Sequence, residues 1–157
     1  MANSLRKANW GLKLFAWRYI PLIGFCSPKI IRMDSKTLEV TMPHSWRTKN
    51  HLGSIYFGAL AIGADLAGAF LVFSKAKARG VNANFAFKDV EGHFLKRPQA
   101  RVHFTSHDGD IIDAMIDESL ASGERINKPV SVVVTVAPEI APLPAESVAT
   151  CTSNDWK

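Results

Sequence analysis

The longest apolar run of the chain constrains its fold most strongly. From Leu52 to Ser74 hydrophobic and small residues occupy every side of a helix, and Asp65 is the one charged residue. Such a segment is either a buried core helix or a membrane span. A charge near the centre of a span costs about 2.5–3.5 kcal/mol, so we favour a buried helix at 52–74. One side of this helix could lie closely against a sheet, because it carries the small residues Gly58, Ala61, Ala64 and Gly68.

The segments on both sides of this run alternate apolar and polar residues, as half-buried strands do. The alternation predicts strands at 29–34, 36–42, 84–98, 100–107, 129–137 and 146–153, with a phase change at Gly92 that is typical of a bulge. Helical spacing predicts two further helices, at 9–20 and 108–123. An apolar helix is best buried when a curved antiparallel sheet wraps around it. We therefore expect one α+β domain over residues 1–157, with about six strands around a central helix.

Positive charge is concentrated at the start of the chain, although the whole chain carries +5. Residues 1–33 hold six basic residues and no acidic one, which leaves 13 basic and 14 acidic residues in the remainder. A protein that follows nucleic-acid phosphates needs its basic stripe on the folded body, so we exclude nucleic acid as a partner. The two cysteines, Cys26 and Cys151, form no Cys-x-x-Cys pair, which favours a reducing, cytoplasmic compartment.

The N-terminal segment 1–27 is basic and amphipathic. Trp10, Leu14 and Trp17 fall on one face of a helix that carries cations elsewhere. Lys13 and Pro21 interrupt the apolar stretch, so it does not have the pattern of a signal peptide. Two interpretations stay open. The helix packs these apolar residues on the body, which we favour, or it forms a basic surface for anionic lipid or a lid over an acyl chain.

The motifs of several enzyme classes are absent, among them the nucleophile elbow, the phosphate-binding loop and the zinc-protease helix. His103 and His107 would lie about 13 Å apart on a strand, too far to share a metal ion, and we expect no metal site. A lone carboxylate on a buried helix has a raised pKa, which suits a general base. The alternative for Asp65 is structural, as a loop cap or as the partner of Arg97 or Arg101.

The residues at the start of the apolar run form a recognisable pattern. They resemble hot-dog-fold acyl-CoA thioesterases of the phenylacetyl-CoA thioesterase branch, whose signature is an Asn, a Gly three residues later, His-Gly-Gly and then an Asp on the central helix. Unbroken spacing places four residues on this signature: Asn50, Gly53, Gly58 and Asp65. Tyr56 and Phe57 stand where the family has His and Gly. The resemblance includes the order of strands and helices over nearly the whole chain.

The resemblance implies hydrolysis of an acyl-CoA thioester without a cofactor. Asp65 would act as general base or nucleophile, and Asn50 would hold the water or the carbonyl. The backbone amide of Phe57, beside Tyr56 in the family's histidine position, would stabilise the oxyanion. The candidates for substrate binding are Gly58, Phe85, Phe87, Arg97 and Arg101. A non-catalytic acyl-CoA-binding or regulatory module is the alternative function.

The spacing of the two catalytic candidates has a consequence for assembly. Residues 57 and 65 are eight apart on one helix, so about 12 Å separates them. They cannot both contact one carbonyl, and a shared site therefore needs a second chain. We expect a homodimer or a dimer of dimers, as the resemblance also implies, with no membrane span and at most a weak membrane contact through the N-terminus.

Overall fold

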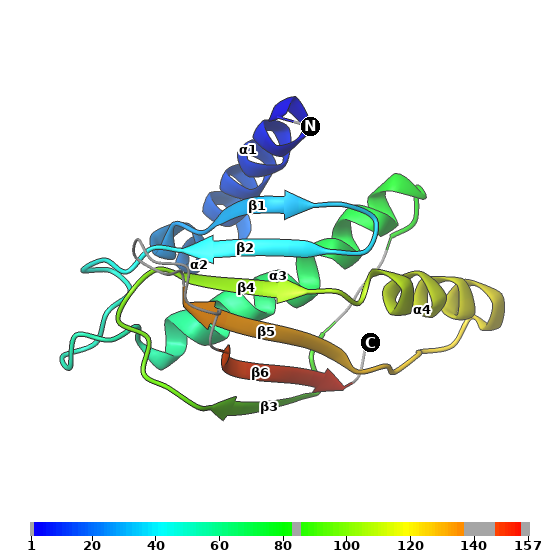
Figure 1. The fold of residues 1–157 in the computed structure, drawn as a ribbon. Coiled ribbons are helices and arrows are strands. Elements are labelled where there is room, and N and C mark those ends of the chain that lie inside the picture. Colours follow the sequence, from blue (N-terminus) through cyan, green and yellow to red (C-terminus); the bar gives the residue numbers. More distant parts are fainter. Residues whose placement is uncertain (1, 83–85, 137–146, 155–157) are drawn as a thin grey trace.

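The computed structural model describes residues 2–82, 86–136 and 147–154. Its four helices are α1 (Ala2–Tyr19), α2 (Pro21–Cys26), α3 (Phe57–Ala78) and α4 (Gly109–Ser122) (Figure 1). The strands are β1 (Lys29–Met33), β2 (Leu38–Met42), β3 (Asp89–Phe94), β4 (Val102–Ser106), β5 (Val130–Val136) and β6 (Ser147–Asn154). Each predicted element has a counterpart, and α2 is an additional short helix. The predicted strand at 84–98 is shorter, and its residues 84 and 85 lie outside the described part of the chain.

The strands form one antiparallel sheet in the order β1-β2-β4-β5-β6-β3. The long helix α3 lies across one face of this sheet (Figure 1), which confirms the predicted α+β arrangement. The predicted bulge at Gly92 is wrong, because β3 pairs with β6 in continuous register from Asp89 to Phe94. The register shifts lie elsewhere, between Ile30 and Arg32 and between Val134 and Thr135.

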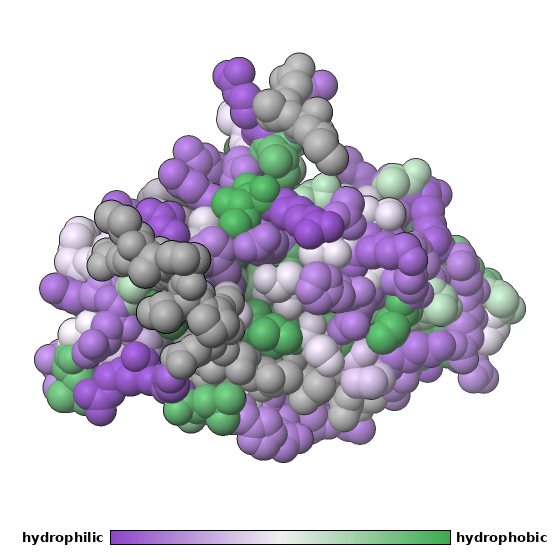
Figure 2. Space-filling model, viewed as in Figure 1, coloured by the Kyte–Doolittle hydropathy of each residue, from purple (hydrophilic) through white to green (hydrophobic). Residues whose placement is uncertain are grey.

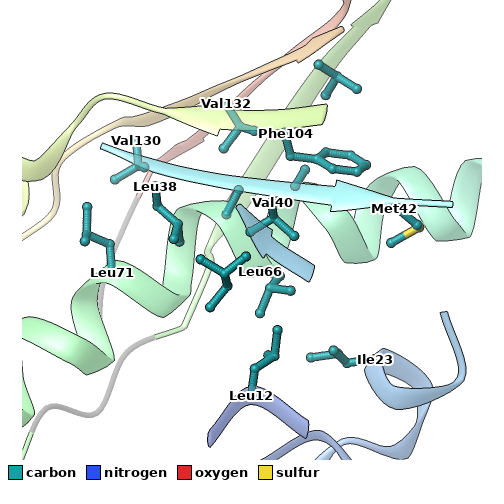
Figure 3. Packing of buried hydrophobic residues seen from close by; sticks show 14 of the residues in the cluster. Leu12, Ile23, Leu38, Val40, Met42, Leu66, Leu71, Phe104, Val130 and Val132 are labelled. Carbon is teal, nitrogen blue, oxygen red and sulfur yellow. The ribbon is translucent and has the colours of Figure 1, made fainter. Parts of the chain in front are cut away.

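The core lies between α3 and the middle strands of the sheet. Alternate residues of β2, β4 and β5 point toward the helix, and the buried ones include Leu38, Val40, Phe104, Val130 and Val132 (Figure 3). Helix and sheet approach each other closely at Gly63, where an added Cβ would lie 2.2 Å from the Phe104 ring. Only glycine lets α3 come this near to β4. The small-residue side predicted from the sequence is partly wrong, because Ala61 is exposed.

Helix α3 begins at Phe57, five residues after the start of the apolar run and at the residue whose amide the resemblance assigns to the helix N-terminus. The chain before it forms a loop that is closed by backbone hydrogen bonds from Tyr56 to Thr48 (2.7 Å) and from Ile55 to Pro98 (2.8 Å). Among the helices in the described ranges, α3 is the one that is long and apolar enough to cross a membrane. It packs against β2, β4 and β5, so these residues serve as the core helix of the domain, as predicted.

The N-terminal segment packs on the body through a different face from the one predicted. In α1 the buried residues are Leu12 and Ala16, and Leu12 points toward the core beside Ile23 of α2 (Figure 3). The predicted contact face of Trp10, Leu14 and Trp17 is instead 68%, 58% and 68% exposed. The periodic pattern identified an apolar stripe correctly but could not tell which of two stripes is buried.

A side chain of α1 also holds the edge of the sheet. The Asn9 amide donates to the Ile30 carbonyl (2.8 Å) and accepts from the Ile30 N–H (2.9 Å). This pair of bonds imitates a neighbouring strand at β1, which is one of the two edge strands, with β3 at the other edge. It fixes the position of α1 along the sheet.

The acidic helix α4 is joined to the basic end of α3 by ion pairs. Asp113 accepts hydrogen bonds from Lys75 (2.5 Å) and Arg79 (2.6 Å), and Arg79 also binds Asp117 (2.5 Å). The four charges form a network rather than an isolated surface pair. The predicted helical excursion therefore holds the C-terminal end of α3.

Candidate active site

Asp65 lies half-buried near the middle of α3. Burial raises the pKa of its carboxyl above the ordinary value, and burial is the one cause of the shift. Within residues 2–82, 86–136 and 147–154 it receives no hydrogen bond or ion pair, and neither Arg97 nor Arg101 contacts it. The structural alternative for Asp65, a cap or an ion pair with these arginines, has no support in the described residues.

Two apolar cavities open beside the Asp65 carboxylate. One, of about 260 Å³, lies between α3 and strands β3 and β5, where Val90, Val130 and Val132 line it. The other, of about 230 Å³, lies between α3 and the N-terminal helices, where Phe15, Ile20 and Ile23 line it. Phe87 and Asp65 belong to both cavities. A polar, ionisable group thus meets hydrophobic space on two sides.

The N-terminal residues of the second cavity were missed by the sequence analysis. Phe15 and Ile20 fall within the helix predicted at 9–20, and the sequence does not indicate which part of the body this helix covers. The lid over an acyl chain, one of the alternatives left open, is the nearest prediction. The periodicity of Leu12, Phe15 and Ala16 was the available signal.

A larger cavity, of about 940 Å³, lies between α1 and α3, nearer to the C-terminal end of α3 than Asp65 is. It shares Phe15, Phe70 and Phe73 with the cavity next to Asp65. Lys7 of α1 and Lys77 of α3 lie at its boundary. The two helices therefore enclose a groove that runs from Asp65 toward the C-terminal end of α3, with aromatic side chains in its middle and lysines at its border.

The N-terminus of α3 presents backbone amides without a side-chain cap. The first N–H groups of the helix that form a hydrogen bond are those of Ala59 and Leu60. Both donate to the Tyr56 carbonyl, at 3.0 and 3.1 Å. The preceding N–H groups, of Phe57 and Gly58, have no acceptor among the described residues. Unpaired amides at the positive end of a helix dipole bind negative charge.

The side chains at this helix end lie toward the surface. Tyr56 is 57% and Phe57 61% exposed, and the Phe57 ring packs edge-on against Phe94 of β3 at 5.6 Å. The Tyr56 ring covers Gly58, where an added Cβ would lie 2.6 Å from it. Gly58 thus makes room for Tyr56, a structural reason for the glycine besides the predicted contact with substrate.

Asn50 organises the loop that precedes α3. Its side-chain oxygen accepts hydrogen bonds from the Leu52 amide (2.9 Å), the Ser54 amide (3.2 Å) and the Ser54 hydroxyl (3.2 Å). The oxygen is therefore already engaged, while the amino group of the side chain makes no hydrogen bond within the described residues. If Asn50 contacts substrate or water, it does so as a donor.

The predicted substrate-binding residues lie in two places. Phe87 lines both cavities at Asp65, whereas Phe85 lies outside the described residues. Arg97 and Arg101 are exposed, and Arg97 precedes Pro98, whose carbonyl binds the loop in front of α3. The arginines thus lie toward the helix N-terminus rather than at Asp65. Among the described residues no group of His, Cys, Asp and Glu side chains could hold a metal ion.

The two halves of the predicted site are separate within one chain. Helix α3 is continuous from Phe57 to Ala78, so the Phe57 amide and Asp65 remain about 12 Å apart. The structure does not bring them together.

Comparison with solved structures places the chain in a known fold. A protein of unknown function from Chlorobaculum tepidum has a TM-score of 0.80 at 16% identity, over 97% of this chain and 94% of that one. A Pseudomonas aeruginosa protein, described as a probable thioesterase, has a TM-score of 0.76 at 17% identity, over 95% and 93%. A thioesterase family protein from Silicibacter pomeroyi has a TM-score of 0.65 at 15% identity, over 99% and 96%.

These similarities confirm the predicted hot-dog fold. No curated protein matches the chain. A family profile, described as a domain of unknown function, matches residues 8–143 and so spans α3 with most of the sheet. The chain therefore belongs to the DUF4442 family.

Proposed function

We propose that the protein hydrolyses an acyl-CoA thioester, with Asp65 as general base or nucleophile. The observation that carries the proposal is the Asp65 carboxylate itself, whose pKa is raised by burial and which borders two apolar cavities. A carboxylate kept there without a partner destabilises the fold, and a raised pKa is typical of acid–base catalysts. The fold, shared with proteins named thioesterases, supports this choice.

The chemistry assigned to Asp65 is proton removal. It would take a proton from water as the oxygen attacks the thioester carbonyl carbon. The tetrahedral oxyanion would then collapse with cleavage of the C–S bond. The departing CoA thiolate would take from Asp65 the proton that came from water. As nucleophile, the Asp65 carboxylate would instead attack the carbonyl carbon and displace the CoA thiolate by cleavage of the C–S bond, and water would hydrolyse the resulting acyl anhydride to the free acid and the carboxylate.

The oxyanion would be stabilised by the Phe57 amide, and Gly58 provides a second free N–H beside it. Since these groups lie about 12 Å from Asp65 of the same chain, a second copy would supply them. We propose a homodimer in which two sites form at the interface.

The edge strand β3 supports this assembly. All six of its residues are exposed in the single chain, including the apolar Val90 and Phe94. As the last strand of the sheet, β3 has a free edge in the single chain, and a free strand edge can pair with another chain. Val90 lines the Asp65 cavity and Phe94 contacts Phe57, so a copy paired along β3 would lie next to both halves of the site.

The acyl group would occupy the groove between α1 and α3. Phe70 and Phe73, eight residues or fewer beyond Asp65, line it, and Lys77 lies about 18 Å from Asp65 along the helix. That length is comparable with one leaflet of a bilayer, about half of a 30 Å hydrocarbon core. We propose a long-chain acyl group, with Arg97 and Arg101 toward the CoA phosphates. The buried free thiol of Cys26 accords with a reducing, cytoplasmic location.

Thiol release from acyl-CoAs of increasing chain length tests the proposal. We expect Asp65→Asn to lower turnover by about 10²–10⁴-fold, while Asp117→Asn, a surface carboxylate of α4, leaves it unchanged. Wild-type turnover in the Asn variant would disprove the role of Asp65. Sedimentation of the active enzyme tests the shared site, because a fully active monomer would require a different oxyanion donor.

The second candidate is a non-catalytic acyl-CoA-binding module. It is favoured by the engaged oxygen of Asn50 and by the exposed Tyr56 in the position of the family's histidine. Such a module would bind acyl-CoA in a titration and release no thiol. Equal binding by wild type and Asp65→Asn, with no turnover by either, would establish it.

A further inference from the structure

Helix α1 has a second apolar stripe that the body of the protein does not cover. Successive residues of an α-helix are about 100° apart around the axis, so Leu14 lies about 40° and Trp17 about 20° from Trp10, on opposite sides. These three side chains are 68%, 58% and 68% exposed. The buried Leu12 and Ala16 lie on the other side of the helix. The stripe therefore faces away from the protein.

Basic residues border this stripe on both sides. By the same geometry, Arg6 and Lys13 lie about 40–60° from Trp10 in one direction and Lys7 and Arg18 about 60–80° in the other. None forms an ion pair within the described residues, and Arg18 rests over the Tyr19 ring at 5.3 Å. No acidic residue occurs before Asp34. In Figure 2 the part of α1 that projects from the molecule shows apolar and hydrophilic side chains next to each other.

The exposed apolar surface continues on α2. The Trp17 ring lies against Gly24, where an added Cβ would be 3.4 Å from it. The next residue, Phe25, is 43% exposed and packs edge-on against Trp46 at 5.8 Å. The guanidinium of Arg47 lies over both rings, at 5.9 Å and 5.7 Å. Aromatic and cationic groups thus alternate across neighbouring elements.

We propose that this surface, formed by α1 and α2 and named here the N-terminal face, binds anionic lipid bilayers. A helix that lies in the membrane interface needs an apolar stripe with Trp or Leu, and basic residues beside it that reach the headgroups. The N-terminal face has both the apolar stripe and the basic residues beside it. Its exposed stripe of Trp10, Leu14 and Trp17 does not line the cavities proposed for the acyl group, although Lys7 borders both the stripe and the larger cavity, so the inference does not depend on that function.

A second copy of the chain fits this face less well. Two N-terminal faces packed together would bring four cationic residues of each α1 against those of the other, with no acidic residue before Asp34 to compensate. Like charges in contact oppose association. An anionic bilayer offers apolar depth for the Trp and Leu side chains and negative charge for the cations.

Co-sedimentation of the full chain with vesicles tests the proposal, using phosphatidylcholine alone and phosphatidylcholine with phosphatidylserine. We expect binding to the anionic vesicles, weaker binding in high salt because charges are screened, and a blue shift of tryptophan emission on binding. Lys13→Gln with Arg18→Gln should weaken binding roughly 25-fold, about fivefold for each cation removed. The matched control is Lys49→Gln with Arg125→Gln, two exposed cations outside the face.

The apolar contribution has a closely matched control. Leu14 of α1 and Leu120 of α4 are 58% and 57% exposed. Leu14→Ala should weaken vesicle binding roughly tenfold, because methyl and methylene groups leave the interface, whereas Leu120→Ala should leave it unchanged. Equal effects of the two substitutions, or equal binding to neutral and anionic vesicles, would overturn the proposal. The proposal would also fail if, in sedimentation without lipid, the wild type were a dimer and the Leu14→Ala variant a monomer. The face would then bind a second copy of the chain.

Discussion

The two long helices of this protein, α1 and α3, reach the core in opposite ways. Helix α3 is apolar on all sides from Phe57 to Ser74, and most of its buried residues face the middle strands of the sheet. Helix α1 carries charge throughout and has two apolar stripes, of which one is buried and the other exposed. A helix without a polar face has one possible location. A helix with two apolar stripes can be placed in two ways, and only its neighbours decide which one is buried.

The largest expected effect separates the two stripes of α1. Leu12→Ala should lower the free energy of unfolding by about 2–5 kcal/mol, because it leaves a cavity in the core. Leu14→Ala, two residues away on the exposed stripe, should change it by no more than about 0.5 kcal/mol. Urea denaturation of both variants measures the difference. Equal losses would mean that the two stripes are equally buried in solution.

A second substitution tests how α1 holds the sheet edge. Asn9→Ala removes both hydrogen bonds to Ile30, and the unpaired backbone groups should cost about 1–3 kcal/mol of stability. Asn9→Asp keeps the acceptor for the Ile30 N–H but places a carboxylate oxygen against the Ile30 carbonyl, so it should lose at least as much. Hydrogen exchange at Ile30 gives a local measure, and unchanged protection in Asn9→Ala would contradict the bridging role.

A third substitution tests the close contact of α3. Gly63→Ala places a methyl group against the fully buried Phe104 ring. Overpacking costs about 1–3 kcal/mol, and the better helix propensity of alanine returns at most about 1 kcal/mol. We expect a net loss of stability in thermal unfolding.

The matched control for Gly63 is Gly58→Ala. Its new Cβ would meet the Tyr56 ring, which is 57% exposed and free to rotate outward. The control should therefore be neutral or stabilising. A neutral Gly63→Ala would show that α3 can move away from β4 at little cost.

The smallest effect concerns the one charge of α3. Because the folded-state pKa of Asp65 is raised by burial, ionisation is harder in the folded chain than in the unfolded one. Stability is therefore greatest below the unfolded pKa, about 4, and declines as the pH rises through the folded pKa. Asp65→Asn should be more stable than wild type at neutral pH, and the gain should vanish at pH 3. A variant less stable at neutral pH would indicate an unrecognised partner of the carboxylate.

The candidate site was predictable where a residue was unusual in its setting. Asp65 stood out because a charge is costly in an apolar helix, and the structure gives it a raised pKa and two cavities. The role of Asn50 in closing the loop before α3 was not predicted, although its hydrogen bonds to Leu52 and Ser54 are of the local kind that Asn forms in turns. The contribution of Phe15 and Ile23 to the wall of a cavity was not predictable, because periodicity indicates a buried side of a helix but not the segment that covers it.

The sequence alone determined the α+β class and the core position of α3, because both follow from which residues can lose contact with water, and it singled out Asp65 as the one charge of an apolar run. The tertiary structure decided the rest. It set the start of α3 at Phe57, since the bonds of Tyr56 and Ile55 to Thr48 and Pro98 hold the preceding residues in a loop. It also decided which stripe of α1 is buried. Periodicity gives the angle between side chains on one helix, whereas burial depends on the surface that a helix meets.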